Sequence, residues 1–549
     1  MNIVIAAGVL ITLVTGIPVL IQLLKGHPRG LIICFLAEMW ERFSYYGMRG
    51  LLIFYLTQHF LFDSKVASGH YGSYTSLVYI VPLLGGFLAD RYLGTRKAVA
   101  FGALLLVAGH LAMAVEGKPA VQTLTYGGQV YEFQAEGRGD QRVAKMIVAG
   151  KLYDVTATET GDFAVKGLPA DAPIPAVLPK SEYKLDVAGR DPLYLNIFWL
   201  ALALIIVGVG FMKANAASLV GQLYPQGDPR RDPGFTLYYY GINLGSFWAA
   251  ILCGVLGVNV GWWAGFGAAG LGMLAGYVIF VLGKPWLLGK GEPPEPEKLK
   301  EKVAGPITRE TVIYGISILA VIAVFFLVQH TPVVSVALIA GMFGSLGYIL
   351  WLAFAKCEKV ERERLLLATV LVLGAVVFWT LFEQAGSSLN LFAATNVDLK
   401  LLSKPVEWLG GAVVLGSPEQ LATAGIATAG KLWINTGFNA AQTQAINAGW
   451  ILIFAPVFAA LWTFLGARGR DPNPVVKFGL ALIQVGAGFL LLKWGATFAD
   501  GAFRLPLIFL VLMYMLHTTG EMCMSPVGLS QMTKLSPAHV VSFVMSVWY

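Results

Sequence analysis

Thirteen long apolar runs follow one another along this chain of 549 residues, and they constrain its fold more than any other feature. A membrane-spanning helix needs about 20 mostly apolar residues. The spans predicted on this rule are 3–24, 31–57, 72–89, 98–115, 193–212, 236–257, 262–282, 312–328, 334–355, 366–392, 448–465, 476–494 and 505–524. A further apolar run begins at Val540 and reaches the last residue, Tyr549.

The composition excludes a soluble or disordered protein. Hydrophobic residues make up 56% of the chain and charged residues only 13%. A soluble surface needs roughly 25–35% charged residues, and disorder requires low hydrophobicity with high charge. The net charge of 39 − 32 = +7 is better explained by basic cytoplasmic loops than by nucleic-acid binding. We therefore predict an all-α integral membrane protein whose surroundings are the lipid bilayer.

Basic residues in alternate loops predict the orientation. Lys and Arg collect in short cytoplasmic loops. The basic loops are DRYLGTRK (90–97), DPRRDPG (228–234), the Lys-rich segment 284–310, KCEKVERER (356–364) and ARGRDPNPVVK (467–477). These loops are expected inside, which leaves residue 1 outside. The chain starts MNIVIAAG without a charged segment, so an uncleaved extra helix over 1–24 is favoured over a cleaved signal peptide.

Two polar segments interrupt the apolar runs. Residues 116–191 contain alternating stretches such as QVYEFQ and KLYDVTATET, which predict a small β-rich excursion on the outer face or, alternatively, a long loop. The charged, proline-interrupted sequence GKGEPPEPEKLKEKVAG (289–305) predicts a cytoplasmic linker. Such a linker separates two halves in many transporters.

A stripe of charge crosses the second apolar run. In FLAEMWERFSYYGMRG (35–50), five residues share one face of about 100° at 100° per residue, namely Glu38, Glu41, Arg42, Tyr45 and Arg49. A charge in mid-membrane costs about 2.5–3.5 kcal/mol on insertion scales. The stripe must therefore face a wet cavity or the bundle interior. A static ion-pair lock is the alternative, but four ionisable groups exceed what a lock needs.

Three lone charges lie in other apolar runs, at Lys213, Glu383 and Glu521. One such glutamate alone could equally snorkel to water, but charges from several helices favour a shared cavity. Ionisable groups in a low-dielectric site can bind and release protons near physiological pH. Carboxylates at one end and Arg or Lys at the other suit a zwitterion. Side-chain pockets could come from Tyr45, Tyr46, Tyr79 and Trp379, although such aromatic residues more often face lipid or the core.

No metal, cofactor or catalytic pattern is found. The cysteines lie far apart without a CxxC pair, and the seven histidines lack zinc-ligand spacing. An intramembrane enzyme would need a nucleophile beside a base. His517 lies near Glu521, but no Ser or Cys completes the arrangement. We expect no metal, no cofactor and no enzymatic activity.

Several motifs in order resemble one family. ERFSYYG after Glu38 resembles the ExxERFxYYG motif of the proton-dependent oligopeptide transporters, which belong to the major facilitator superfamily. Further matches are GGFLADRYLG, GFMKANAASLVGQLY, LYYYGINLGSF, FEQAGSSLNLF and EMCMSPVGLSQMTKLSP. The match covers most of the chain.

The resemblance implies a major facilitator fold of two six-helix bundles that rock to alternate access, with a two-helix hairpin between them. The expected domains are an N-terminal helix 1–24, a first bundle 30–283 with the outer insertion 116–191, a cytoplasmic linker 284–310, a hairpin 311–356 and a second bundle 365–549. The chain would end early in the eleventh core helix, before the last two helices, which we interpret as truncation.

The resemblance also implies residue roles. Proton coupling and gating fall on Glu38, Glu41, Arg42, Lys213 and Glu383. Substrate binding falls on Arg49, Tyr45, Tyr46, Tyr79, Lys213, Asn243, Trp379, Asn447, Glu521, Ser525 and Trp548. Arg49 and Lys213 would hold a peptide carboxylate, and Glu521 with Asn447 the amino terminus. Gly72 stands where some relatives have a histidine, and His70 lies off that position, so a histidine relay is in doubt.

The expected function is symport of protons with di- and tripeptides into the cell, by a monomer in the plasma membrane, most simply a bacterial inner membrane. Protons would be the coupling ion, and small peptides the partners. Two alternatives remain. One keeps the fold and changes the substrate to nitrate, an amino-acid conjugate or a peptide-like drug; the other, more remote, is an intramembrane enzyme.

Overall fold

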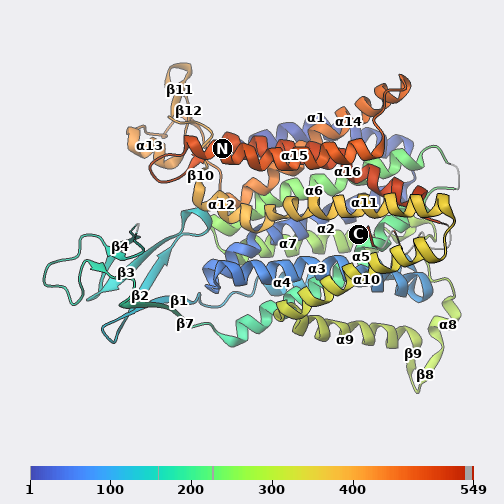
Figure 1. The fold of residues 1–549 in the computed structure, drawn as a ribbon, viewed down its shortest axis with the longest axis horizontal. Helices are drawn as coiled ribbons and strands as arrows, with labels where there is room; N and C mark the ends of the chain where they lie inside the picture. The colour runs from blue at the N-terminus through green and yellow to red at the C-terminus, as the bar shows by residue number, and fades with distance from the viewer. Residues whose placement is uncertain (1, 159, 226–227, 538–543, 545–546, 549) are drawn as a thin grey trace.

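The computed structural model describes residues 2–158, 160–225, 228–537, 544 and 547–548. Long helices lie side by side along the long axis of the molecule (Figure 1). Eleven stretches of the described residues are long and apolar enough to cross a membrane. One of them, Ser64–Met113, holds two predicted spans, and the charged helix α2 (Arg29–Phe54) adds another, so that 11 + 1 + 1 = 13. The predicted all-α membrane fold class is confirmed.

The helices keep close to the predicted spans. Their bounds are α1 (Ile3–Gly26), α3 (Ser64–Leu88), α4 (Gly94–Met113), α5 (Pro192–Gln222), α6 (Arg231–Asn259), α7 (Trp262–Leu282), α9 (Arg309–Gln329), α10 (Thr331–Ala355), α11 (Lys359–Phe382), α12 (Ser388–Asn396), α14 (Ala445–Ala467), α15 (Pro474–Gly495) and α16 (Leu507–Leu535). Helices satisfy every backbone polar group internally, as hydrocarbon requires. Short polar side chains cap several starts: Asp63, Asp191 and Asn473 each accept a bond from a backbone N–H of the first turn.

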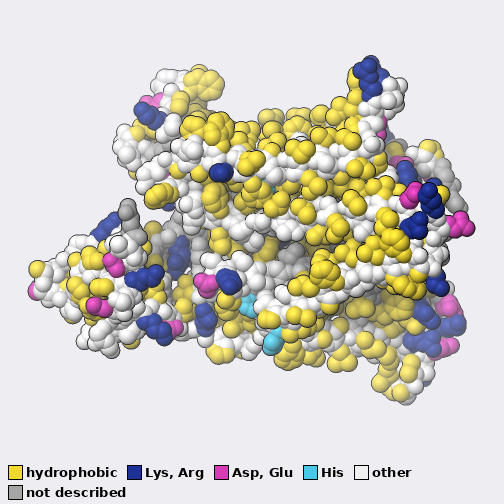
Figure 2. All heavy atoms as spheres, in the orientation of Figure 1, with side chains coloured by type: hydrophobic (Ala, Val, Ile, Leu, Met, Phe, Trp, Pro, Cys, Tyr) yellow, Lys and Arg dark blue, Asp and Glu magenta, His cyan; other side chains and the backbone are white. Residues whose placement is uncertain are grey.

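Figure 2 shows how the surface divides. Hydrophobic side chains cover the middle of the face shown, whereas most Lys, Arg, Asp and Glu side chains lie toward its two ends. This distribution matches a bilayer core bounded by water.

The insertion between α4 and α5 is an antiparallel sheet of seven strands in the order β6-β5-β4-β3-β2-β1-β7. The strands are β1 (Val121–Tyr126), β2 (Gln129–Glu136), β3 (Val143–Val148), β4 (Lys151–Ala157), β5 (Phe163–Val165), β6 (Val177–Leu178) and β7 (Tyr183–Ala188). Leu124, Phe133, Met146 and Val165 form part of a small core of its own. The β-rich alternative is therefore confirmed over the long loop. We call the end of the helix bundle that bears this sheet the insertion end.

A second excursion at the insertion end lies between α12 and α14 (Figure 1). It comprises β10 (Val397–Asp398), β11 (Val406–Trp408), β12 (Val413–Leu415), α13 (Pro418–Ala424), β13 (Leu432–Ile434) and the short 3-10 helix η7 (Ala440–Gln444), and β10 pairs with β14 (Leu505–Pro506). The sequence analysis did not predict this sheet, because strands of two or three residues are too short to show alternation.

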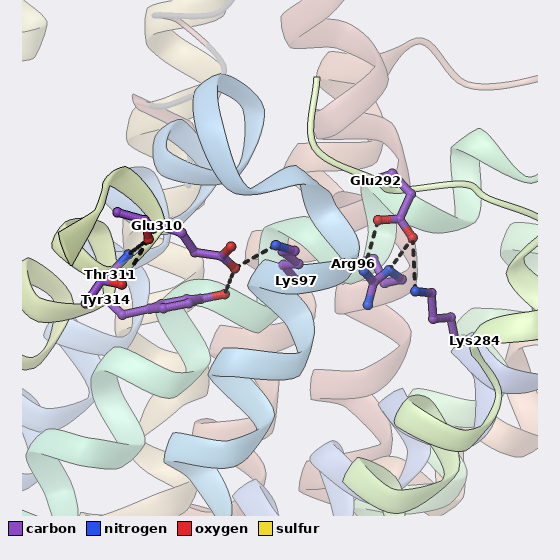
Figure 3. Close-up of polar contacts among 8 residues, drawn as sticks. Arg96, Lys97, Lys284, Glu292, Glu310, Thr311 and Tyr314 are labelled. Atoms are coloured by element: carbon purple, nitrogen blue, oxygen red, sulfur yellow. Dashed lines mark hydrogen bonds and ion pairs between the residues drawn. The ribbon is translucent and has the colours of Figure 1, made fainter. Parts of the chain in front are cut away.

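The segment between α7 and α9 lies at the opposite end, which we call the linker end. It contains η4 (Lys284–Leu287), α8 (Pro296–Lys300), β8 (Lys302–Ala304) and β9 (Ile307–Thr308). Arg96 of α4 donates two hydrogen bonds to Glu292, of 2.7 and 2.9 Å (Figure 3). These bonds from Arg96 hold the pKa of Glu292 below its ordinary value. Lys97 pairs with Glu310 of α9 at 2.6 Å. The linker is thus fastened to the start of α4.

Gly94 permits this close docking. Its φ of 73° ends the helical path of α3 and the π-helix η2 (Ala89–Leu93) before α4 begins. A Cβ built there would lie 2.5 Å from the backbone carbon of Glu292. Only glycine fits both the conformation and the contact.

Helix α1 packs against α6 and also contacts the segment that precedes α14. Thr15 shares a 2.8 Å hydrogen bond with Tyr240 of α6, and Trp248 of α6 donates to Thr12 at 2.9 Å. At the insertion end, the N–H of Ile3 donates to the carbonyl of Asn435, directly after β13. The helix therefore contacts elements that lie on both sides of the linker.

Candidate functional site

The charged stripe of α2 is buried. Glu38 is 2%, Glu41 0%, Arg42 7% and Arg49 6% exposed, so the stripe faces the bundle interior. The Nε atom of Arg42 lies 3.0 Å from Glu38 Oε1 and 2.8 Å from Glu41 Oε2. The guanidinium carbon lies 5.7 Å from the ring centre of Tyr45. Two carboxylates thus share one cation.

Both carboxylates have oxygen atoms without a hydrogen-bond partner among the described residues. Among the described residues, Glu41 Oε1 and Glu38 Oε2 have no hydrogen-bond donor, and Glu41 Oε2 is compensated only by its ion pair with Arg42. A buried charged oxygen without a donor loses its hydration uncompensated. Adding a proton to Glu41 removes that penalty, so the arrangement suits a carboxyl group that gains and loses a proton.

Lys213 of α5 faces Tyr79 of α3. Its Nζ atom lies 3.5 Å from the centre of the Tyr79 ring, a cation–π contact. Among the described residues, Glu38 and Glu41 form ion pairs with Arg42 and not with Lys213. A pairing of Lys213 with these carboxylates stays a prediction.

Arg49 joins helices from both sides of the linker. Its guanidinium pairs with Glu383, directly after α11, and its Nε donates to the Tyr71 hydroxyl of α3 at 2.5 Å. The ring of Tyr46 lies 5.7 Å from the guanidinium carbon. We call α2–α7 the N-terminal helices and α11–α16 the C-terminal helices; the Arg49–Glu383 pair bridges the two sets.

The helix that carries Glu383 is broken, although 366–392 was predicted as one span. Helix α11 ends at Phe382, η5 covers Glu383–Gly386, and α12 starts after Ser387, whose φ and ψ of −123° and −95° are not helical. A Cβ at Gly386 would overlap the Tyr71 hydroxyl and approach Arg49 Nε within 3.0 Å. The missing side chain makes room for the Arg49–Tyr71 pair.

Glu521 provides a carboxylate on the C-terminal helices. Asn447 of α14 donates from Nδ2 to Glu521 Oε2 at 3.3 Å and to Thr518 Oγ1 at 2.9 Å. The sequence-based grouping of Glu521 with Asn447 is thus reproduced as a contact. Glu521 thus stands on the C-terminal helices, whereas Arg49 and Lys213 stand on the N-terminal ones, beside the Glu38–Glu41–Arg42 cluster.

Other predicted residues have contacts of a more local kind. The Asn243 amide donates to the Tyr239 carbonyl of its own helix at 3.0 Å. Trp379 packs edge-on against Phe382, and Trp548 lies 5.9 Å from the Phe478 ring. Ser525 is half-buried in α16. Their substrate-binding roles remain predictions.

Three residues at the site were not predicted: Tyr71, Tyr74 and Asn390. Tyr74 is fully buried with its ring 6.3 Å from Tyr45, and Asn390 donates to the Gly50 carbonyl at 3.0 Å. The signal available was spacing, since Tyr71 and Tyr74 fall on one face of α3 at i and i+3. That face could not be matched to α2 without tertiary contacts.

The two sets of helices meet toward one end. Among the described residues, the hydrogen bonds and ion pairs that join N-terminal to C-terminal helices are Arg49–Glu383 and Asn390–Gly50, and both lie in the half of α2 nearer the insertion end. Nearby, a Cβ at Gly254 of α6 would lie 3.2 Å from the Cβ of Ala441. The insertion end is therefore closed in this structure.

In the described ranges, no group of three or more His, Cys, Asp or Glu side chains is placed to hold a metal ion.

Comparisons with known proteins identify relatives along the chain. A sequence model of the POT family matches residues 96–407 and 419–549. The chain is 31% identical to an uncharacterized transporter, YclF, of Bacillus subtilis (strain 168), over 95% of this chain and 85% of that protein. It is 28% identical to the peptide transporter YePEPT of Yersinia enterocolitica, again over 95% and 85%. A crystal structure of a peptide transporter with alafosfalin superposes with a TM-score of 0.65 at 29% identity, covering 95% of this chain and 86% of that one.

Proposed function

The chain belongs to the POT family of transporters, and on that premise we propose that it couples proton entry to the uptake of di- and tripeptides by alternating access. It is a multi-pass membrane protein and a transporter rather than an enzyme. We place it in the plasma membrane of a bacterium with the basic linker end in the cytoplasm and the insertion end outside. The bundles 30–283 and 365–549 are the parts that move, with the linker and hairpin between them.

One observation carries the substrate class: cations suited to a carboxylate and a carboxylate suited to an ammonium group stand on opposite sets of helices. Arg49 and Lys213 belong to the N-terminal helices, and Glu521 with its partner Asn447 belongs to the C-terminal helices. A short peptide is a zwitterion that carries a positive charge at one end and a negative charge at the other. Its carboxylate suits the guanidinium and ammonium groups, and its amino terminus suits Glu521.

The Arg49–Glu383 pair supplies the coupling step. The pair bridges the two sets of helices while the insertion end is closed. A proton on Glu383 removes the ionic partner of Arg49, and the guanidinium becomes available to a peptide carboxylate. The peptide and the proton thus both bind more tightly to a state in which the Arg49–Glu383 pair is broken. A ligand shifts a conformational equilibrium by such a difference in affinity.

Glu41 is the second proton site in this proposal. Its Oε1 atom has no hydrogen-bond donor among the described residues, and its Oε2 atom shares Arg42 with Glu38. Protonation of Glu41 leaves Glu38 and Arg42 as a neutral pair. That change would weaken the electrostatic attraction between the carboxylates and Lys213 on the neighbouring α5.

Uptake into proteoliposomes tests the function. With an inward pH gradient, the protein should accumulate dialanine, and a panel of peptides should compete with it better than nitrate or amino-acid conjugates do. Failure to accumulate any peptide under a gradient would refute the proposal.

A Glu41→Gln variant tests the coupling. It should lower gradient-driven uptake to the level of protein-free liposomes while counterflow exchange of peptide persists, because exchange needs no net proton transfer. The matched control is Glu358→Gln, which changes an exposed glutamate between α10 and α11. Driven uptake that survives in Glu41→Gln would contradict the assignment.

A further inference from the structure

The β-rich insertion touches both sets of helices. The connection from β2 to β3 contains η3 (Gly139–Gln141), flanked by Gly137 with a φ of 74°. We call residues 137–141 the hook. Figure 1 shows the insertion approaching α12 at the end of the helix bundle, and η3 contacts both α12 and η7.

The hook is fixed to the N-terminal helices. Gln58, just beyond α2, donates to the Gly139 carbonyl at 2.9 Å and accepts from the Gly139 N–H at 2.8 Å. Both ends of the insertion are bound to the same segment: the N–H of Ala120 donates to the His59 carbonyl at 2.8 Å, and Arg190 donates to the carbonyls of Phe60 and Leu61 at 2.7 Å. The sheet therefore moves with α2.

The same hook bonds to the C-terminal side. Asp140 Oδ1 accepts a hydrogen bond of 2.9 Å from the N–H of Ala440, the first residue of η7. Ala440 is fully buried, and η7 leads directly into α14. A carboxylate acceptor on a backbone N–H at a helix start is a charge-assisted bond. One residue further, Ala441 packs against Gly254 of α6.

We infer that the hook is a latch that holds the insertion end closed, with Asp140 as its releasable contact. The inference rests on the proposed alternating access, because the insertion end must open for a substrate to enter from outside. The sheet has its own core and its own anchors on residues 58–61, just beyond α2, so its folding does not need the bond to Ala440. That bond joins two parts that must separate when the insertion end opens.

The first test measures opening directly, without a transported substrate. Ala441 is 1% exposed in the closed end, so an Ala441→Cys reporter, in a protein whose four native cysteines are replaced, reacts with a membrane-impermeant maleimide only when that end opens. Removing a charge-assisted hydrogen bond shifts such an equilibrium by roughly 5- to 30-fold. Asp140→Ala should raise the labelling rate by that factor.

Matched variants keep the test decisive. Asp140→Asn retains an acceptor oxygen and should label more slowly than Asp140→Ala, whereas Asp171→Ala removes an exposed acid of the same insertion and should label like the parent. Gln58→Ala, which frees the other side of the hook, should also label faster. Unchanged labelling in both Asp140→Ala and Gln58→Ala would overturn the latch.

Cross-linking gives an independent readout. An Asp140→Cys/Ala440→Cys protein, joined by a short thiol cross-linker with a cleavable disulfide, should stop peptide uptake, and reduction should restore it. A cross-linked protein that transports at the full rate would show that transport does not require this contact to open, and would overturn the latch. A protein that labels faster in Asp140→Ala yet transports no peptide would retain the latch and refute the proposed substrate instead.

Discussion

Arg49 binds two partners through two different nitrogen atoms of one planar group, an arrangement that the single nitrogen of lysine does not offer. Its Nε donates to Tyr71 while its terminal nitrogen pairs with Glu383. The fork of a guanidinium has donors in fixed directions, so one partner orients the group for the other. Tyr71 is therefore a positioning residue for Arg49, on the same edge of the guanidinium as the ion pair.

Tyr71→Phe tests this role. This variant keeps the ring and removes the hydroxyl, so the hydrogen bond that orients Arg49, worth about 1 kcal/mol, is lost. The KM for dialanine should therefore rise roughly 5-fold, with little change in the maximal rate. Uptake kinetics in proteoliposomes measure both constants. Tyr131→Phe, which removes a hydroxyl bonded to Gln129 within the insertion, is the control and should leave KM unchanged. A KM that stays constant in Tyr71→Phe would exclude the role.

For individual residues, the sequence predicted which side chains share one face of a helix and that this face is buried. Glu38, Glu41, Arg42 and Arg49 fall on one face because the helical period acts locally, and their burial follows from the cost of charge in lipid. The contact of Arg49 with Tyr71 of α3 could not be predicted from the sequence. That contact depends on how α3 packs on α2, which no period in either segment encodes.

The linker and the hairpin are fastened to α4 by ion pairs at the linker end. Arg96 holds Glu292 and Lys97 holds Glu310 (Figure 3). Because the pKa of Glu292 is lowered by its bond to Arg96, its contribution to docking is full above the ordinary glutamate pKa of about 4.3 and is lost as the pH falls through the lowered value. Docking should therefore be constant across the neutral range and weaken only in acid.

Glu292→Gln imitates the protonated state at pH 7. We expect faster hydrogen–deuterium exchange in residues 289–305, because a neutral amide binds Arg96 less strongly than a carboxylate does. Glu297→Gln changes a glutamate of the same segment whose side chain is 89% exposed and should exchange like the parent protein. Equal exchange in all three proteins would mean that the Arg96–Glu292 bonds do not hold the linker.

The break after α11 depends on Gly386. A Cβ there overlaps the Tyr71 hydroxyl, so Gly386→Ala should destabilise the protein by about 1–3 kcal/mol, the usual cost of overpacking. Thermal unfolding in detergent measures the loss. Gly315→Ala in α9, where nothing lies within 4 Å, should be neutral or stabilising because alanine favours helix. A stable Gly386→Ala would show that Tyr71 can move aside.

Whole elements were predicted unevenly. The apolar spans were found because length and hydropathy identify a membrane helix without knowledge of its neighbours. The break within 366–392 was missed, since Gly386 and Ser387 interrupt an apolar run without changing its overall hydropathy. The small sheet β11–β13 was missed because its strands have three residues each.

Over the whole molecule, the predicted fold class and family are confirmed by the helices and by the relatives of the chain. The orientation, the domain bounds and the residue roles remain predictions. The closed insertion end could not be foreseen, because a transporter sequence encodes several conformations and no pattern states which one is populated. It follows instead from Arg49–Glu383, Asn390–Gly50 and the hook.

The seven ionisable side chains of the site have an electrical consequence. Four are acidic (Glu38, Glu41, Glu383 and Glu521) and three are basic (Arg42, Arg49 and Lys213), which gives 3 − 4 = −1 when all are ionised. With protons on both proposed sites, Glu383 and Glu41, the site carries −1 + 2 = +1, and a zwitterionic peptide leaves that charge unchanged. In the proposed cycle the loaded carrier would move one positive charge inward, and the empty one would return carrying a negative charge. A potential that is negative inside, worth about 2.3 kcal/mol per charge at 100 mV, would speed that return, and uptake would be electrogenic.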